Sequence, residues 1–143
     1  MEFAYAAKFA RAREGGYTVT FRDFPEIVTE GEDIADAMVM ASDALGVAIT
    51  ERIEDGKPVP PPSPPRSRER LAAVPSRVAA KAALYCALAG AGISRNELAR
   101  RIGGQSLQVR RLLDTRRSSN LDRIDTALAK VGKRLVIGLK DAS

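Results

Sequence analysis

Residues 93–113 read ISRNELARRIGGQSLQVRRLL, and this stretch decides how the second half of the chain folds. Ser94 and Glu97 have the spacing of a capping box, in which each side chain satisfies a backbone donor of the other residue. Gly103 is the residue type that most often ends a helix. The pattern predicts a short helix that ends before Gly103 and a second one over Ser106–Leu113. Two short helices joined by a Gly-containing turn are typical of the helix-turn-helix motif.

The apolar residues of this stretch fall where two packed helices need them. They are Leu98, Ala99, Ile102, Val109, Leu112 and Leu113. Ala99 is small, as required where two helices cross closely. This spacing favours a DNA-binding motif over a plain helical bundle.

Further helices are predicted on both sides of the motif. Apolar residues three and four positions apart predict helices over 77–89 and 121–131. Residues 134–139 read RLVIGL, which is too apolar and β-branched for a tail. Because a lone strand beside helices leaves its backbone groups unpaired, we expect this segment to pair with its copy in a second chain. The dimerising side chains are then Leu135, Val136, Ile137 and Leu139.

The first half of the chain has a different period. Bulky residues alternate with smaller ones over 3–10 and 17–21, and a shorter run follows over 27–31, so three strands are predicted. After Asp33, which can cap a helix, apolar residues recur every three or four positions to about Glu54. The order β-β-β-α indicates a small antiparallel sheet with one face covered by a helix, in the α+β class.

Proline divides the chain. Six of the eight prolines lie within residues 58–65, where they favour an extended, semi-rigid spacer. We therefore predict a first domain over 1–57, a Pro-rich linker over 58–68, and an all-helical domain with the terminal strand over 75–143. Residues 69–74 can add an edge strand to the sheet of the first domain.

The formal net charge of +5 is the sum of two opposite halves. Residues 1–57 hold 12 Asp and Glu against 6 Lys and Arg, whereas residues 58–143 hold 6 against 17. This asymmetry indicates two modules with different partners, and the basic module suits a polyanion. Nearly all aromatic residues lie in the first 24 positions, so the basic half lacks a platform for stacking unpaired bases. Duplex DNA is therefore favoured over a single strand.

The composition excludes several kinds of site. The chain of 143 residues has no His and one Cys. A Ser-His-Asp triad, a His metal ligand, an intramolecular disulfide and a Cys-built zinc site are therefore excluded. No apolar run approaches the roughly 20 residues that span a bilayer, and the first residues lack the order of a secretory signal. We expect a cytoplasmic protein with no membrane partner, no metal and no cofactor.

The joint order of motifs in the two halves is more specific than any single motif. In the first half the motifs are Gly15–Tyr17, Val19, Phe21, Phe24–Pro25, Thr29–Glu32, Ala35–Ala37, Ala44–Leu45 and Pro58–Ser63. In the second half they are Lys81–Tyr85, Glu97–Gly103, Val109, Arg111–Leu113, Leu121–Asp122, Gly132–Lys133 and Leu135. This order resembles the HicB antitoxins of bacterial HicA–HicB toxin–antitoxin systems, over nearly the whole chain.

The resemblance implies a fold and two binding activities. The first half would be a partial ribonuclease H-like domain that binds and blocks the small toxin HicA, an mRNA-cleaving ribonuclease. The second half would carry a Cro/repressor-type helix-turn-helix that binds double-stranded operator DNA and represses its own operon. The implied assembly is a homodimer or a higher oligomer. An acidic domain suits a basic RNA-cleaving partner, and a basic domain suits DNA.

The resemblance also places candidate DNA contacts. The positions that face the major groove in the repressor fold are Gln105, Ser106, Leu107, Gln108 and Arg111. Phosphate contacts are expected near helix starts and in the loop that follows, at Arg95, Asn96, Arg116, Arg117 and Asn120. Gln105 is a poor helix cap, so the second helix of the motif is expected either to start at Ser106 or to be loosely ordered without DNA.

Two alternatives remain open at this point. A metal-dependent nuclease needs clustered carboxylates, for which the first half offers Glu2, Asp23, Glu26 and Glu30. Asp23 and Glu26 fall in or beside a turn rather than on facing strands, so we do not expect an enzyme. The second alternative is a repressor whose first half senses a small molecule or binds another protein, although a thin β-β-β-α unit leaves little room for a pocket.

Overall fold

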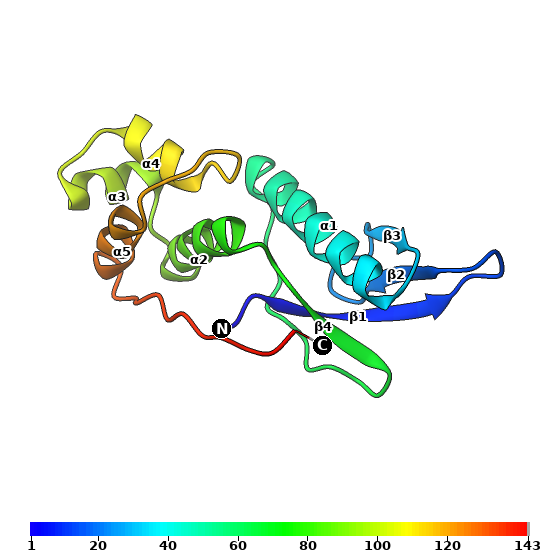
Figure 1. Cartoon of the computed structure of the whole chain (residues 1–143). Helices are drawn as coiled ribbons and strands as arrows, with labels where there is room; N and C mark the ends of the chain where they lie inside the picture. Colours follow the sequence, from blue (N-terminus) through cyan, green and yellow to red (C-terminus); the bar gives the residue numbers. More distant parts are fainter. Residues whose placement is uncertain (143) are drawn as a thin grey trace. The chain divides into compact units, whose positions relative to one another are not determined.

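Four strands form one antiparallel sheet in the order β3-β2-β1-β4 (Figure 1). They are β1 (Ala4–Arg11), β2 (Tyr17–Phe21), β3 (Val28–Gly31) and β4 (Glu69–Ala73). In this computed structural model, which describes residues 1–142, β1 is paired on both sides. Its Ala7 lies opposite Phe21 of β2 and opposite Arg70 of β4. The α+β class, the three predicted strands and the additional edge strand are confirmed.

One long helix, α1 (Ile34–Glu54), packs against all four strands on one face of the sheet (Figure 1). Asp33 begins it as predicted, because its carboxylate accepts the backbone N–H of Asp36 at 2.8 Å. The apolar stripe of α1 that is buried consists of Ala37, Ala41, Leu45, Ala48, Ile49 and Ile53. The sheet contributes the buried side chains of Tyr5, Ala7, Val19 and Phe21. Spacings of three and four on the helix and of two on the strands therefore build this core.

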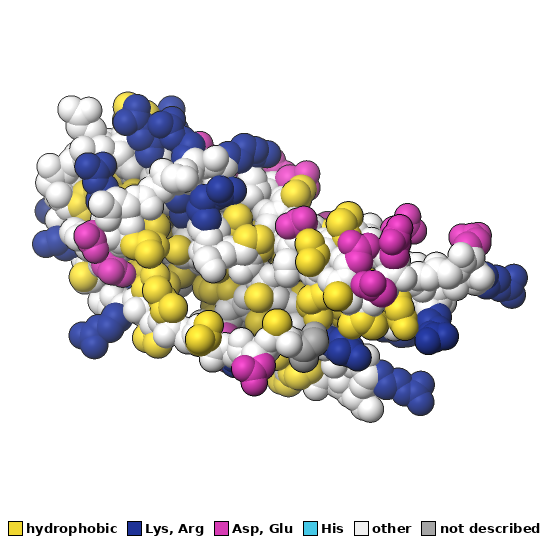
Figure 2. All heavy atoms as spheres, viewed as in Figure 1, with side chains coloured by type: hydrophobic (Ala, Val, Ile, Leu, Met, Phe, Trp, Pro, Cys, Tyr) yellow, Lys and Arg dark blue, Asp and Glu magenta, His cyan; other side chains and the backbone are white. Residues whose placement is uncertain are grey.

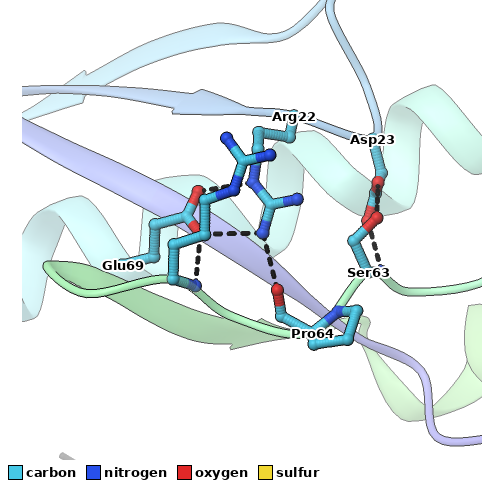
Figure 3. Close-up of polar contacts among 6 residues, drawn as sticks. Arg22, Asp23, Ser63, Pro64 and Glu69 are labelled. Atoms are coloured by element: carbon cyan, nitrogen blue, oxygen red, sulfur yellow. Dashed lines mark hydrogen bonds and ion pairs between the residues drawn. The ribbon is translucent and has the colours of Figure 1, made fainter.

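The Pro-rich segment 58–68 packs along the first unit and carries the chain from α1 back to β4. Tyr5 donates its hydroxyl hydrogen to the carbonyl of Pro60 at 2.7 Å. Asp23 accepts the backbone N–H of Ser63 at 2.8 Å and its hydroxyl at 2.6 Å (Figure 3). An extended proline run makes no hydrogen bonds within itself, so its carbonyl oxygens are available to donors from neighbouring side chains. The segment predicted as a spacer between domains is thus an internal strap of the first unit.

The chain divides into two compact units, residues 1–79 and Ala80 onward. The boundary falls inside helix α2 (Ser76–Ala91) and differs from the predicted one at the prolines. The first unit therefore holds 13 acidic and 10 basic residues, and the second holds 5 and 13. The net charges of the two units still have opposite signs. The first unit is less acidic than expected because it includes the arginines around β4.

The second unit is helical. It contains most of α2 together with α3 (Arg95–Ile102), α4 (Ser106–Leu113) and α5 (Leu121–Ala129). The helices pack around one apolar cluster of Ala80, Leu84, Leu88, Leu98, Ala99, Val109, Leu112, Leu113, Ile124, Ala127 and Leu128. The predicted inward residues of α3 and α4 are mostly in it. In α2 the buried side includes Leu84, whereas Tyr85 is half-buried against the cluster. None of the helices within residues 1–142 has the length and apolar character needed to span a membrane.

The apolar segment near the end of the chain has no regular structure in a single chain. Residues 133–142 form neither helix nor strand. Leu135 is half-buried against the apolar cluster of the second unit. Val136, Ile137 and Leu139 are 83%, 79% and 100% exposed. The predicted strand is therefore not formed by the described residues alone, and its pairing with a second chain stays a prediction.

Glu69, the first residue of β4, holds the end of the strap. Its carboxylate accepts two hydrogen bonds from Arg22, from Nε at 2.9 Å and from Nη2 at 2.8 Å (Figure 3). It also accepts the backbone N–H of Arg66 at 2.7 Å. The bond from Arg22 is the main reason why the pKa of Glu69 is lowered to about 2, and the backbone bond adds to it. Arg22 also donates to the carbonyl of Pro64 at 2.7 Å, so a single guanidinium joins strap and strand.

We predict that Glu69→Gln destabilises the chain in a pH-dependent way. Because the folded-state pKa is depressed, the stabilisation is present above the unfolded value near 4.5 and is lost as pH falls toward about 2. Neutralising the pair should cost about 1–2 kcal/mol at pH 7. Urea unfolding of both chains from pH 7 to pH 3 measures the difference.

The control is Glu14→Gln, which neutralises an exposed carboxylate in the β1–β2 turn. It should leave the free energy of unfolding nearly unchanged. A Glu69→Gln cost that stays constant down to pH 3 would contradict the assignment.

Candidate functional site

Helix α3 begins and ends close to the prediction, with one difference. Ser94 caps it, since its hydroxyl oxygen accepts the backbone N–H of Glu97 at 3.0 Å. The carboxylate of Glu97 accepts from the guanidinium groups of Arg100 and Arg101, which lower its pKa to about 2. The Glu97 half of the predicted capping box is thus replaced by ion pairs within the helix. Gly103 ends α3 in the left-handed conformation, at a φ of 68°.

Helix α4 starts at Ser106, as expected from the poor capping ability of Gln105. The backbone N–H of Gln105 donates to the side-chain oxygen of Gln108 at 3.3 Å, so Gln108 caps the helix from within. The hydroxyl of Ser106 donates to the side-chain oxygen of Asn96 at 2.9 Å. This bond joins the start of α4 to the start of α3 and holds two predicted DNA contacts together.

The burial of one side of α4 fixes which side it exposes. Val109, Leu112 and Leu113 are buried with Leu98 and Ala99 of α3. All five predicted base-facing residues are exposed, namely Gln105, Ser106, Leu107, Gln108 and Arg111. An exposed polar and basic face next to a helix pair is the geometry that a base-reading helix needs.

The predicted phosphate contacts are also exposed. Arg95 and Asn96 lie in the first turn of α3, and Arg116 and Arg117 lie in the loop after α4. Asn120 caps α5, because its side-chain oxygen accepts the backbone N–H of Asp122 at 2.8 Å. Figure 2 shows Lys and Arg side chains gathered over the part of the second unit that holds α3 and α4.

A buried lysine behind α4 was missed by sequence reasoning. Lys81 of α2 is 0% exposed. Its ammonium group donates to the carbonyls of Arg111 and Asp114 and to the hydroxyl of Ser119. The available signal was its spacing of three and seven residues from Leu84 and Leu88, which puts it on the buried side of α2. Because lysine is usually a surface residue, the residue type alone gives no sign that this position is buried.

The outer face of α1 carries acidic and apolar side chains in alternation. The exposed residues of this face are Asp36, Val39, Met40, Asp43, Val47, Glu51 and Glu54. Figure 2 shows acidic and hydrophobic side chains next to each other along this helix. Because the opposite face of α1 packs on the sheet, this outer face, which we call the α1 outer face, is available to a partner.

Two of the four carboxylates considered for a nuclease bind other residues of the first unit. Asp23 binds Ser63 in the strap. Glu26 accepts two hydrogen bonds from Arg52, both at 2.9 Å, which lower its pKa. Among residues 1–142, no three His, Cys, Asp or Glu side chains are close enough to hold a metal ion. The structure thus does not assemble the carboxylate cluster that this alternative requires.

The alternative of a small-molecule sensor would use the surface of the first unit. An open hollow of about 620 Å³ lies beside Arg11, Tyr17 and Ile34, and another of about 520 Å³ lies beside Arg68 and Arg70. Over the described part of the chain, every buried side-chain nitrogen or oxygen has a hydrogen-bond partner. No buried polar side chain in that part of the chain therefore needs a ligand as its hydrogen-bond partner.

The chain is similar to known antitoxins. Residues 4–83 match a family described as the HicB-like antitoxin of bacterial toxin–antitoxin systems. The chain is 39% identical to Antitoxin HicB of Escherichia coli (strain K12) over 131 residues, which are 92% of this chain and 95% of that protein. It is 32% identical to Antitoxin HicB 1 of Photorhabdus laumondii over 136 residues, or 95% and 86% of the two chains. It is 28% identical to Antitoxin HicB of Pseudomonas fluorescens (strain Pf0-1) over 141 residues, or 98% and 96%.

The α+β fold and these matches define the chain as an antitoxin of a toxin–antitoxin system. The family match covers the first unit and the start of the second, whereas the relatives align over most of the chain. The chain belongs to the HicB-like antitoxin family, as the order of motifs indicated.

Proposed function

We propose that this antitoxin binds and neutralises a HicA-type mRNA-cleaving toxin and represses its own operon by binding operator DNA. The observation that carries the proposal is the alignment with proteins named Antitoxin HicB over more than nine-tenths of the chain. The net charges of the two units have opposite signs, which supports toxin binding by the acidic first unit and DNA binding by the basic second unit. Both partners act in the cytoplasm, which is the location that we propose.

We propose that α3 and α4 form a helix-turn-helix with α4 in the major groove. This proposal is supported by the exposed polar face of α4, whose opposite face packs in the apolar cluster of the second unit. Gln105 and Gln108 can pair with adenine, and Arg111 can pair with guanine. Leu107 offers an apolar contact to a thymine methyl group. The arginines at the start of α3 and after α4 would hold phosphates and fix the register of α4.

We predict that Arg111→Ala weakens binding to the specific operator by about 1–3 kcal/mol and changes binding to random DNA little. The reason is that a base contact discriminates between sequences, whereas a phosphate contact does not. Titration of the full chain with labelled duplexes of both kinds, at one salt concentration, measures the two affinities.

Arg123→Ala is the matched control, since it removes the same charge from an exposed position on α5. It should reduce both affinities slightly and equally. If Arg111→Ala also lowers both affinities equally, Arg111 contacts phosphate and the assignment is wrong.

We propose that the first unit is the partial ribonuclease H-like domain and that it meets the toxin through the α1 outer face. The element order β1-β2-β3-α1 supports the first part of this proposal. The alternation of acidic and apolar side chains supports the second part, because a protein that holds RNA needs a basic surface. Carboxylates would steer that surface, and Val39, Met40 and Val47 would be buried on contact.

We predict that Asp43→Lys weakens toxin binding about tenfold, or about 1.4 kcal/mol, because it places a cation against a basic partner. The partner for the experiment is the toxin encoded next to the gene for this chain. Calorimetric titration of that toxin into the full chain measures the affinity.

Glu14→Lys is the control, since it makes the same charge change in the β1–β2 turn. Equal weakening by both variants would show that only the total charge matters. An unchanged affinity of Asp43→Lys would remove the α1 outer face from the interface.

We propose that residues 134–139 pair with the same segment of a second chain. The support is the exposure of Val136, Ile137 and Leu139, since three such side chains in a short run are costly to leave in water. A two-fold dimer would also present two copies of α4 to two operator half-sites.

We predict that the full chain sediments as a dimer or a larger oligomer at micromolar concentration and that Ile137→Glu is monomeric. A buried, unpaired carboxylate in the strand pair would cost more than the pairing supplies. Lys133→Glu, which changes charge outside the apolar run, should not dissociate the assembly. A wild-type chain that sediments as a monomer would refute the proposal.

A further inference from the structure

The buried ammonium group of Lys81 is fully engaged behind α4. It donates to the carbonyl of Arg111 at 2.9 Å, to the carbonyl of Asp114 at 2.8 Å and to the hydroxyl of Ser119 at 2.8 Å. An ammonium group has three donors, which is enough to make these three contacts at once. The side chain is among the largest in the chain that are completely buried.

The three acceptors belong to two segments that carry predicted DNA contacts. Arg111 lies in the last turn of α4, and Asp114 is the residue that follows the helix. Carbonyls at a helix end carry partial negative charge, which a cation stabilises. Those of Arg111 and Asp114 also accept the backbone N–H groups of Asp114 and Arg117. Ser119 lies at the far end of the loop that contains Arg116 and Arg117. Lys81 therefore ties the end of the proposed recognition helix to the loop proposed to hold phosphates.

A lysine is a costly choice for this position. Removing an ammonium group from water requires good hydrogen bonds in return, and the three acceptors are uncharged oxygens. A methionine would fill a similar volume without that cost, since replacing buried charges by apolar groups is often neutral or stabilising. An apolar side chain donates no hydrogen bonds, so it cannot hold two carbonyls and one hydroxyl in a fixed arrangement around a single atom.

We infer that Lys81 is a positioning residue for DNA recognition, which fixes the end of α4 relative to the loop at 114–120. The inference rests on the DNA-binding function proposed for the second unit. In this arrangement Arg111 has a fixed position relative to Arg116 and Arg117. Its base contact and their phosphate contacts can then form on the same duplex at the same time. Lys81 itself does not touch DNA, because it is buried behind the helix.

Loss of the Lys81 contacts should affect specific and non-specific DNA binding differently. Non-specific affinity comes from phosphate neutralisation and tolerates a loop that moves. Specific affinity needs base and phosphate contacts at the same time, so it depends on their relative placement. Loss of the Lys81 contacts should therefore reduce specific binding far more than non-specific binding.

The experiment compares variants of the full chain on two duplexes of equal length. One duplex covers the promoter region upstream of the gene for this chain, and the other has a random sequence. Lys81→Met should bind the upstream duplex roughly tenfold more weakly and the random duplex within about twofold of wild type. Lys133→Met removes the same charge from an exposed position and should weaken both duplexes by a similar, small factor.

A milder variant covers the case in which Lys81→Met fails to fold. Ser119→Ala removes one acceptor and keeps the lysine, so it should weaken binding to the upstream duplex roughly threefold. Ser118→Ala, at the exposed neighbouring position, should bind both duplexes like wild type. The carbonyl ¹³C resonances of Arg111 and Asp114 should shift in Lys81→Met, which reports the loss of the two hydrogen bonds directly.

The outcomes separate the two proposals. If wild type prefers the upstream duplex and the folded variants Lys81→Met and Ser119→Ala keep that preference, the role of Lys81 is refuted and the proposed function stands. If Lys81→Met only lowers the melting temperature while its folded fraction binds like wild type, Lys81 is structural and the inference is also refuted. If wild type does not prefer the upstream duplex, both proposals fail.

Discussion

The pairing of β4 with β1 is the constraint on which the first unit depends. β1 is hydrogen-bonded to β2 on one side and to β4 on the other, so the chain must return from the end of α1 to the far edge of the sheet. The Pro-rich strap makes this return in an extended form. Its prolines have no N–H group that needs an acceptor, and the carbonyls of Pro60 and Pro64 accept hydrogen bonds from Tyr5 and Arg22.

This return moves the boundary between the two units into α2. The arginines of β4 and of the turn before it become part of the sheet unit, and the second unit starts from the middle of a helix. The prolines thus lie within the first unit and not between the two units, although they mark the place where composition changes. Each unit keeps its own core, and the exposed helix faces include the α1 outer face in the first unit and the polar face of α4 in the second.

Local signals predicted the helices well. The bounds of α1 agree with the sequence because a cap residue and an apolar period lie within that segment. Helix α4 also has the predicted bounds, although Gln105 is a poor cap, because Gln108 caps the helix from within. The exposure of Arg111 also followed from the sequence, because placing Val109 and Leu112 inward leaves that position outward.

Contacts between distant residues could not be predicted in the same way. The bond from Tyr5 to Pro60 joins residues 55 positions apart, and that from Lys81 to Arg111 joins residues 30 apart. An extended proline run has the same local pattern whether it is a free linker or a strap. Glu97 had two competing partners, the backbone at Ser94 and the arginines one turn later, and the spacing suits both.

The central claim is that this chain neutralises a toxin encoded beside it. The most direct measurement is the growth of cells in which that toxin is induced, with and without co-expression of the full chain. Co-expression should restore growth, and the toxin should co-purify with the chain. A folded, expressed chain that neither restores growth nor retains the toxin would contradict it.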